Sequence, residues 1–419
     1  MKYLAKLAYK NLYRQKLRTA VSIAAIVFSV AVVVFARGLI SGFIGSIYSD
    51  YIYYDSGHIR IVKQEYLKKE RLLSLAYPVD GFEGEGISSM VARLEELEGI
   101  NMALPRLKFG AVVSTDDELI KMMGWGVDPE KEKEFTDIDE LLVEGRFPRR
   151  GMKEIVLGSE LLAKLDKGVG EKVTVLYTTS FNSFQATTFK IVGRIESGLK
   201  LLNETVFMVP LDVAQKALYM PDQATELLLV TPDLNRAGEY LPGIRKVFER
   251  QGGLNNYAIR AWDDSSGMIR LMKMAENIYN VIYVFLVVLA SFVVINSMIM
   301  IVKERTREIG MMSALGLGKR QILQLFVLEG GVMGVVGSFI GALLGGLITR
   351  VVAVTGIDYT KALEGMGEDI LMRPVIYPVF SFDNMIFAFV LGVVVTSLAC
   401  LIPARRAARL KPTEALREI

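Results

Sequence analysis

The chain contains 419 residues, of which 52% are hydrophobic and 23% are charged, and its formal net charge is +3. This apolar content exceeds that of an ordinary water-soluble protein, so we expect part of the chain to lie in a membrane. A single histidine and a single cysteine exclude, in practice, a metal site built from several His and Cys ligands, a Cys-His catalytic dyad and an intramolecular disulfide.

The first 18 residues are basic and have helical periodicity. Basic side chains recur at every fourth residue, with small or leucine side chains between them: Lys2, Lys6, Lys10 and Arg14, and Leu4, Leu7, Ala8 and Leu12. This spacing predicts an amphipathic helix on the anionic inner leaflet, whereas a plain positive-inside anchor explains the charges but not their spacing. The following apolar run ends at Phe35-Ala36-Arg37-Gly38 without a small-x-small cleavage site, so we expect a retained anchor rather than a signal peptide.

Four stretches are long and apolar enough to cross a hydrocarbon core, which needs about 20 residues. They cover residues 19–36, 277–302, 321–349 and 384–404, and only the third contains a charge, Glu329. The predicted organisation is therefore 1–18 (cytoplasmic amphipathic helix), 19–49 (first transmembrane helix with an outer extension), 50–273 (extracytoplasmic domain), 274–302 (second transmembrane helix), 303–320 (cytoplasmic loop), 321–349 (third transmembrane helix), 350–383 (outer loop), 384–404 (fourth transmembrane helix) and 405–419 (cytoplasmic tail).

The distribution of charge predicts the orientation of these spans. The segments before the first span, between the second and third, and after the fourth carry 16 basic and 4 acidic residues, whereas the rest of the chain carries 33 and 42. Short loops rich in Lys and Arg stay in the cytoplasm, so we expect both termini inside and residues 37–276 outside. Because the basic residues follow the membrane face and not the folded domain, nucleic-acid binding is disfavoured.

The outer domain alternates strand-like and helical runs without a regular βαβ repeat, which predicts an α+β fold. The expected strands are 59–62, 111–114, 155–157, 173–177, 189–195, 206–209 and 227–230, and the expected helices are 88–97, 159–165, 212–218 and 236–249. Breaks near Pro105, Gly145 to Gly151 and Pro210 suggest an inserted subdomain. His58 precedes the first strand, where we expect a structural hydrogen bond rather than general-base work.

The third span contains glycines spaced by four residues, Gly337, Gly341 and Gly345, which let another helix approach closely. Generic packing and a dimer seam both explain this stripe. The carboxylate of Glu329 is costly inside a span unless it is paired, hydrated or near the interface. A position near the inner headgroups and a mechanistic role both stay open for it.

The segment after the second span predicts a short cytoplasmic helix. In a helix, Ile309, Met312 and Leu315 share one apolar face beside alternating charges, and Gly316 and Gly318 end the helix before the third span begins. Such a helix between two spans suits transmission of force from a soluble partner. An interfacial linker is the alternative.

Two motifs give this chain a resemblance to a known family. Glu304-Arg305-Thr306-Arg307-Glu308-Ile309-Gly310, followed by Ala314-Leu315-Gly316, resembles the hallmark loop of FtsX-like permeases, the class that includes the MacB exporter and the lipoprotein-releasing LolC and LolE permeases. The end of the chain, Pro403-Ala404-Arg405-Arg406-Ala407-Ala408-Arg409-Leu410-Lys411-Pro412-Thr413-Glu414-Ala415-Leu416-Arg417, is similar to the second hallmark of that class. The order of one span, a large outer domain and three spans agrees with it, as do the runs Ser56-Gly57-His58-Ile59, Gly126-Val127-Asp128-Pro129 and Glu144-Gly145-Arg146.

The resemblance implies a four-helix membrane protein with a MacB-like periplasmic core domain, placed in the bacterial inner membrane as two permeases, identical or paralogous, with two ATPase subunits. It implies that the loop helix docks into the ATPase through Glu304, Arg305, Arg307, Glu308, Ile309, Gly310, Met312 and Leu315, with Ile309 and Met312 as the apolar plug. The 419 residues contain no Gly-x-x-x-x-Gly-Lys-[Ser/Thr] loop. We therefore expect a permease rather than an enzyme, with no cofactor or metal in this chain, and with ATP and Mg²⁺ in the partner.

The first functional hypothesis is release of lipoproteins from the inner membrane to a periplasmic carrier. Two apolar stripes at the outer ends of the first two spans are candidates for a lipid or substrate pocket: Phe35, Leu39, Phe43 and Ile47, and Met274, Ile278, Ile282 and Phe285. Packing within the bundle or a dimer interface is the alternative. LolC-like permeases carry a Pro-containing loop that binds the carrier, and the matching stretch here, residues 177–188, has no proline; Phe181 and Phe184 are its candidate contacts, with plain hairpin positions as the alternative.

Two other functions stay open at this stage. MacB-type export of peptides or drug-like compounds from the periplasm would use an adaptor and the same ATPase coupling. An FtsX-like mechanical regulator that transports nothing is the third hypothesis, although FtsX has a much smaller outer domain than the roughly 240 residues found here.

Overall fold

The computed structural model describes residues 16–114, 119–136, 138–197, 199–264, 267–359 and 375–410. The chain divides into two compact units. We call Met1–Gly45, Met272–Asp358 and Val375–Ile419 the membrane unit, and Ser46–Leu271 with Tyr359–Pro374 the outer unit. The predicted amphipathic helix before residue 16 and the tail after residue 410 lie outside the described residues, and with them the last part of the second hallmark motif.

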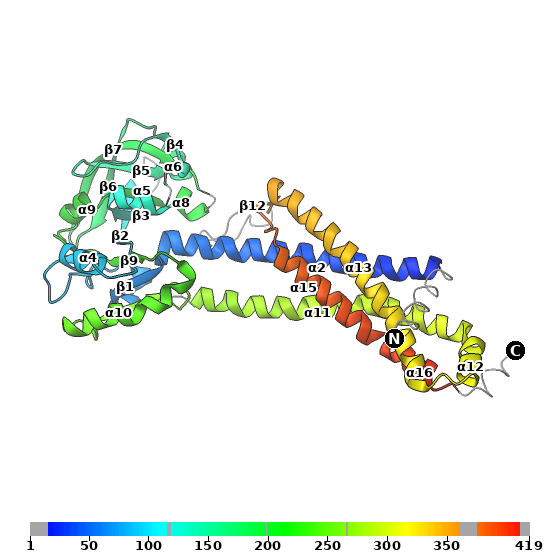
Figure 1. The fold of residues 1–419 in the computed structure, drawn as a ribbon. Coiled ribbons are helices and arrows are strands. Elements are labelled where there is room, and N and C mark those ends of the chain that lie inside the picture. Colours follow the sequence, from blue (N-terminus) through cyan, green and yellow to red (C-terminus); the bar gives the residue numbers. More distant parts are fainter. Residues whose placement is uncertain are drawn as a thin grey trace. The chain divides into compact units, whose positions relative to one another are not determined.

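The membrane unit is built from long helices (Figure 1). They are α2 (Lys16–Tyr51), α11 (Gly267–Glu304), α13 (Lys319–Thr355), and α15 (Phe382–Ala399) continued by α16 (Leu401–Ala408). Four helical stretches in the described residues are long and apolar enough to cross a membrane, which confirms the predicted number of spans. Two short elements also belong to the unit: the helix α12 (Thr306–Ala314) and the antiparallel pair of β11 (Ile357–Asp358) and β12 (Val375–Ile376).

The glycine stripe of α13 packs against α2 of the same chain. A Cβ atom added to Gly341 would lie 2.7 Å from the Val27 carbonyl oxygen, and one added to Gly345 would lie 2.7 Å from the Ala31 carbonyl oxygen. The two backbones therefore approach as closely as small residues allow. On its α15 side, α13 meets the buried Cys400, whose Sγ lies where a side chain at Gly330 would be. The stripe serves packing within one chain.

The outer unit is built on a mixed sheet with the strand order β10-β1-β9-β2-β3-β8-β5-β7-β4, and β6 pairs with β2 and β7. The strands are β1 (Ile59–Lys63), β2 (Met102–Ser114), β3 (Leu119–Val127), β4 (Leu142–Gly145), β5 (Glu154–Gly158), β6 (Lys172–Thr178), β7 (Phe184–Ile195), β8 (Val206–Pro210), β9 (Glu226–Val230) and β10 (Tyr257–Ala261). The pairs β3–β8 and β5–β7 are parallel and the others antiparallel. This arrangement confirms the predicted α+β class.

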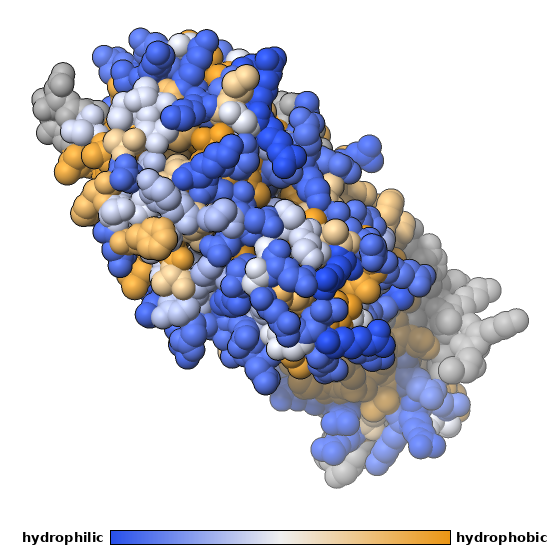
Figure 2. All heavy atoms as spheres, turned by 90° about the vertical axis from the view of Figure 1, so that its left-hand side faces the viewer, coloured by the Kyte–Doolittle hydropathy of each residue, from blue (hydrophilic) through white to orange (hydrophobic). Residues whose placement is uncertain are grey.

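Helices cover the sheet and enclose two principal cores. The helices are α3 (Gln64–Lys68), α4 (Ile87–Glu95), α5 (Pro129–Thr136), α6 (Ile138–Leu141), α7 (Ser159–Lys164), α8 (Lys200–Glu204), α9 (Leu211–Ala217) and α10 (Ala237–Arg250). One core joins α4 and α10 to β1, β9 and β10, and the other joins α7 and α9 to the β2, β3 and β5–β8 strands. The face seen in Figure 2 is mainly hydrophilic, as expected for a domain in water.

Pro105, near which the sequence suggests a break, lies inside the 13-residue strand β2 and is paired with Leu227 of β9. The two principal cores divide along the chain at this point, between Ala103 and Leu107. The pairing of β2 with β3 starts only at Arg106. The missing N–H of Pro105 therefore costs no ladder bond to β3, which explains why the strand tolerates it.

Buried charges connect the end of the first helix to the sheet. After α2, residues Ile52–Ser56 form a π-helical turn. Arg106, fully buried on β2, donates to the Tyr53 carbonyl oxygen at 2.8 Å and pairs with the buried Glu132 at 2.5 Å. Lys108 Nζ lies 2.9 Å from the Asp55 carboxylate and 2.8 Å from that of Glu226. These interactions fix the turn to β2 inside the outer unit.

Candidate functional site

The loop between the second and third spans is a helix with a defined break on each side. α11 ends at Glu304, Arg305 adopts a non-helical conformation, and α12 runs from Thr306 to Ala314. Gly316 then takes a φ of 98°, which glycine adopts without strain, and the N–H of Gly318 donates to the Gln321 side chain at 2.9 Å before α13 begins. The predicted short helix is therefore present, and the glycines end it as expected.

The two faces of α12 differ in exposure. Ile309 is only 1% exposed and, with Met312 beside it, packs against the core of the membrane unit. Met311 is 46% exposed and Leu315 is 85% exposed. The predicted apolar plug of Ile309 and Met312 is thus turned toward its own chain. Met311 and Leu315, with the exposed Arg307, form the exposed side of α12 and of the residue that follows it.

Arg305, expected from the sequence to contact a partner, is buried inside the membrane unit. Its Nη1 lies 3.5 Å from Oε1 of Glu329, whose side chain is also buried, and its Nε lies 3.9 Å from Glu308. Glu304 pairs with Arg18 of α2 at 2.5 Å. The carboxylate within the third span therefore has an opposite charge beside it, and the two residues that precede α12 form ion pairs with α2 and α13.

The two predicted lipid-contacting stripes differ in how far their side chains are exposed. Met274, Ile278, Ile282 and Phe285 are all exposed on α11, whereas Phe35, Leu39 and Phe43 are half-buried and Ile47 is buried. The α11 side chains that line a cavity with α2 are instead Glu276, Tyr279, Asn280 and Tyr283. The α11 stripe faces away from α2 and is free to meet lipid or another chain.

The predicted carrier-contacting loop is the hairpin between β6 and β7. Phe181 is 75% exposed and Phe184 is 83% exposed, and the Phe181 ring lies 6.2 Å from that of Tyr219. Phe184 also lines a groove of about 770 Å³ together with Leu72, Leu75 and Met122. Large apolar side chains exposed as a group are typical of an interaction surface.

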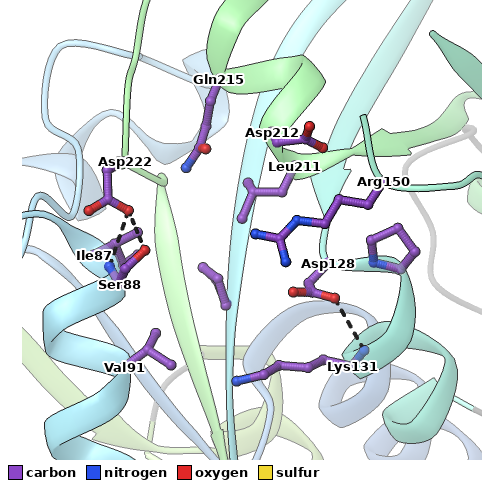
Figure 3. A pocket seen from close by; sticks show the side chains of 12 residues that line it. Ile87, Ser88, Val91, Asp128, Lys131, Arg150, Leu211, Asp212, Gln215 and Asp222 are labelled. Carbon is purple, nitrogen blue, oxygen red and sulfur yellow. Dashed lines mark hydrogen bonds between the residues drawn. The ribbon is translucent and has the colours of Figure 1, made fainter. Parts of the chain in front are cut away.

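A second cavity of the outer unit, of about 170 Å³, is lined by three carboxylates (Figure 3). Asp222 accepts the Ser88 N–H at the start of α4, Asp128 accepts the Glu130 N–H at the start of α5, and Asp212 accepts the Gly151 N–H. Each carboxylate therefore already accepts a hydrogen bond from a backbone N–H. In the described parts of the chain, no group of three or more His, Cys, Asp or Glu side chains is placed to hold a metal ion.

His58 makes the structural hydrogen bond expected of it. Its Nδ1 lies 3.0 Å from the Thr231 N–H, which donates to it, and 3.0 Å from the Thr231 hydroxyl. Burial lowers the pKa of His58 below its ordinary value, against the opposing influence of Asp233. The ring therefore stays neutral in the folded protein at a pH where an unfolded chain would protonate it.

We expect acid to destabilise the outer unit through this residue. Below pH about 6.5, His58 is protonated in the unfolded state but stays neutral in the folded state. The free energy of unfolding therefore falls as the pH falls through this range. Both tryptophans of the chain, Trp125 and Trp262, lie in the outer unit, so their fluorescence follows its thermal unfolding. The melting temperature should drop between pH 7 and 5.5 in the native chain and less in His58→Asn, whose Oδ1 can accept the same N–H without titrating. Equal drops in both proteins would contradict this role.

Comparison with known proteins fits this architecture. The MacB-like periplasmic core domain family matches residues 19–240, and the FtsX-like permease C-terminal family matches residues 280–412. The chain is 24% identical over 327 residues to the lipoprotein-releasing system transmembrane protein LolC of Xylella fastidiosa (strain 9a5c), covering 75% of this chain and 77% of that protein. It is 25% identical over 342 residues to LolE of Haemophilus influenzae, covering 77% and 79%.

A third relative differs in extent. The macrolide export ATP-binding/permease protein MacB of Nitrobacter winogradskyi is 27% identical over 314 residues, which cover 73% of this chain but 43% of that protein. The two matched families together include most of each of the four spans and most of the outer unit. The family resemblance inferred from the two motifs is confirmed. The chain belongs to the FtsX-like permeases with a MacB-like periplasmic core domain, and it is a permease of the ABC transporters.

Proposed function

We propose that this protein releases lipoproteins from the inner membrane to a periplasmic carrier, driven by two separate ATPase subunits. The observation that carries the proposal is the extent of the similarity. LolC and LolE, named as lipoprotein-releasing proteins, are matched over more than three quarters of their length, whereas the MacB relative, named as an ATP-binding and permease protein, is matched over less than half. Both termini would lie in the cytoplasm, and a second permease copy or a paralogue would complete the complex.

The membrane unit supports this proposal at its inner end. Met311 of α12 and Leu315 just after it are exposed on the side away from the core of the membrane unit. The two residues before α12, Glu304 and Arg305, form ion pairs with α2 and α13. Movement of a partner bound to this surface would therefore be transmitted to α2 and α13 together. ATP and Mg²⁺ would be bound by that partner.

The outer unit supports the handover of cargo to a carrier. Phe181 and Phe184 project from the β6–β7 hairpin beside a groove whose lining includes Leu72, Leu75 and Met122, which suits a carrier that itself must shield acyl chains. On α11, the exposed stripe of Met274, Ile278, Ile282 and Phe285 suits acyl-chain contact within the membrane. The two surfaces would serve successive stages of release.

A reconstituted system tests the proposal. Proteoliposomes with the permease, its ATPase and a fluorescent lipoprotein should release the lipoprotein only when ATP and a soluble carrier are both present. In the double variant Phe181→Asp, Phe184→Asp we expect release to fall at least about tenfold, since two exposed anchors of an interface are lost, with ATP hydrolysis unchanged.

Leu119→Asp is the matched control, because Leu119 is another exposed side chain of the outer unit that does not line the groove. It should release lipoprotein normally. ATP-dependent movement of a macrolide or peptide without lipoprotein release would replace the proposal by MacB-type export. Release unaffected by the double variant would remove the hairpin from the carrier contact.

A further inference from the structure

Three spans meet at one cation in the membrane unit. Arg37 of α2 donates from Nε to the Asn384 side-chain oxygen at 2.7 Å and from Nη1 to that of Asn280 at 3.0 Å. Its guanidinium lies 4.0 Å from the centre of the Phe387 ring. Arg37 directly follows the first apolar run, Asn384 begins the fourth, and Asn280 lies at the start of the second. The cluster therefore lies at the boundary between hydrocarbon and headgroups.

The charge of Arg37 is solvated by this cluster but not neutralised. Amide oxygens carry no net charge, and the two hydrogen bonds use two of the five guanidinium N–H groups. In the described part of the chain, no carboxylate lies within ion-pair distance of Arg37. An arginine at the edge of a span without a counter-charge favours a phosphate group, which guanidinium binds with paired, charge-assisted hydrogen bonds.

A cavity opens beside this arginine. It has a volume of about 210 Å³, lies between α2 and α11, and is lined by Arg37, Ile40, Ser41 and Ile44 and by Glu276, Tyr279, Asn280 and Tyr283. The Tyr283 side chain is 3% exposed, and its hydroxyl has no hydrogen-bond partner among the described residues. A buried hydroxyl without a partner is costly, so its presence in the wall beside Arg37 indicates a second donor for a bound ligand.

A carboxylate lies on the other side of the cavity. Glu276 precedes Asn280 by one helical turn, about 6 Å along α11, in the direction away from the apolar run. It is exposed and forms no ion pair with a described residue. The cation is thus nearer the hydrocarbon and the anion nearer the water. In a phospholipid with an ethanolamine headgroup the order is complementary, because its phosphate adjoins the glycerol and its ammonium lies further out.

We propose that this cavity binds the headgroup of a zwitterionic ethanolamine phospholipid. The phosphate accepts hydrogen bonds from Arg37 and Tyr283, and the ammonium pairs with Glu276. This lipid is bound by the permease itself and does not depend on which cargo the transporter moves.

Lipid binding by the purified full-length permease tests the site. Native mass spectrometry in detergent, with phosphatidylethanolamine and phosphatidylglycerol of identical acyl chains, should show preferential retention of phosphatidylethanolamine. Arg37→Gln should weaken binding of both lipids at least about tenfold, because a charge-assisted contact is lost. Glu276→Gln should keep phosphate binding and abolish the preference between the two lipids, and Tyr283→Phe should weaken both severalfold without disturbing the helix packing.

Arg350→Gln is the matched control, since Arg350 near the end of α13 lies over the Phe380 ring outside this cavity. It should retain both lipids as the native chain does. If Arg37→Gln does not fold, Arg37→Lys and Tyr283→Phe carry the test, because both keep the charge. An unchanged lipid preference in Glu276→Gln would overturn the zwitterion assignment, and displacement of the lipid by millimolar inorganic phosphate would show a simple anion site instead.

Discussion

Replacing Leu315 with aspartate should weaken binding of the ATPase subunit about a hundredfold while leaving the permease folded. Leu315 is the most exposed apolar side chain of the α12 segment, so its removal costs the permease no packing. In an interface, loss of a buried leucine and burial of an unpaired carboxylate together cost about 3 kcal/mol or more, and each 1.4 kcal/mol is tenfold in affinity. Titration of labelled ATPase onto permease in nanodiscs measures the change directly.

Two further substitutions make this result specific. Met152→Asp places the same charge at an exposed methionine of the outer unit and should leave ATPase binding unchanged. Ile309→Asp, by contrast, puts a charge into the core of the membrane unit and should lower its thermal stability as well as its binding. Full affinity in Leu315→Asp would show that α12 does not dock through its exposed side.

Removing the carboxylate of Glu132 should destabilise the outer unit by about 3–5 kcal/mol, the cost of leaving a buried charge unpaired. Glu132→Ala removes the carboxylate that pairs with Arg106 at a site closed to water. Arg106 also donates a hydrogen bond to the Tyr53 carbonyl oxygen of the π-helical turn. For a domain of this size the melting temperature should fall by roughly 10 °C. Tryptophan fluorescence of the full chain follows this transition, because Trp125 and Trp262 are both in the outer unit.

The exposed pair of Arg236 and Glu239 provides the comparison. Its side chains lie 2.6 Å apart, as close as the buried pair, but both are more than half exposed. Glu239→Ala should therefore leave the melting temperature where it was, because water and salt screen such a contact. The same shift in both variants would mean that burial does not set the strength of the Arg106 pair.

Periodicity in the sequence predicted the elements that have one clear apolar face. The amphipathic runs of α4 and α10 and the alternating run of β6 fall close to their observed bounds. β3 was missed because Gly124 and Gly126 interrupt its pattern and resemble turn residues. In the fold these glycines are needed for contact: a Cβ at Gly124 would lie 2.3 Å from the Phe109 ring. Such a requirement belongs to the neighbouring strand and is invisible in the local sequence.

The position of α12 was predictable from the sequence, but which of its side chains are buried was not. The motif located α12 correctly, but Arg305 and Arg307 look alike in sequence, and only the fold places the first beside Glu329, 24 residues further on. Likewise Ile309 and Leu315 share an apolar pattern, and the direction of the helix relative to its own core decides which of them is exposed. The sequence shows Arg37 only as a charge at the end of the first span, because its partners Asn280 and Asn384 lie hundreds of residues away.

The burial of Cys400 has a practical consequence for following motion in this transporter. The only thiol of the chain is enclosed against Gly330 of α13 and is closed to aqueous reagents. A cysteine introduced at an exposed position is therefore the one site that a maleimide or spin label reaches. Labels on α12 and on the outer unit can be attached in pairs without first removing a native residue, so distance changes during ATP turnover become measurable in an otherwise unaltered protein.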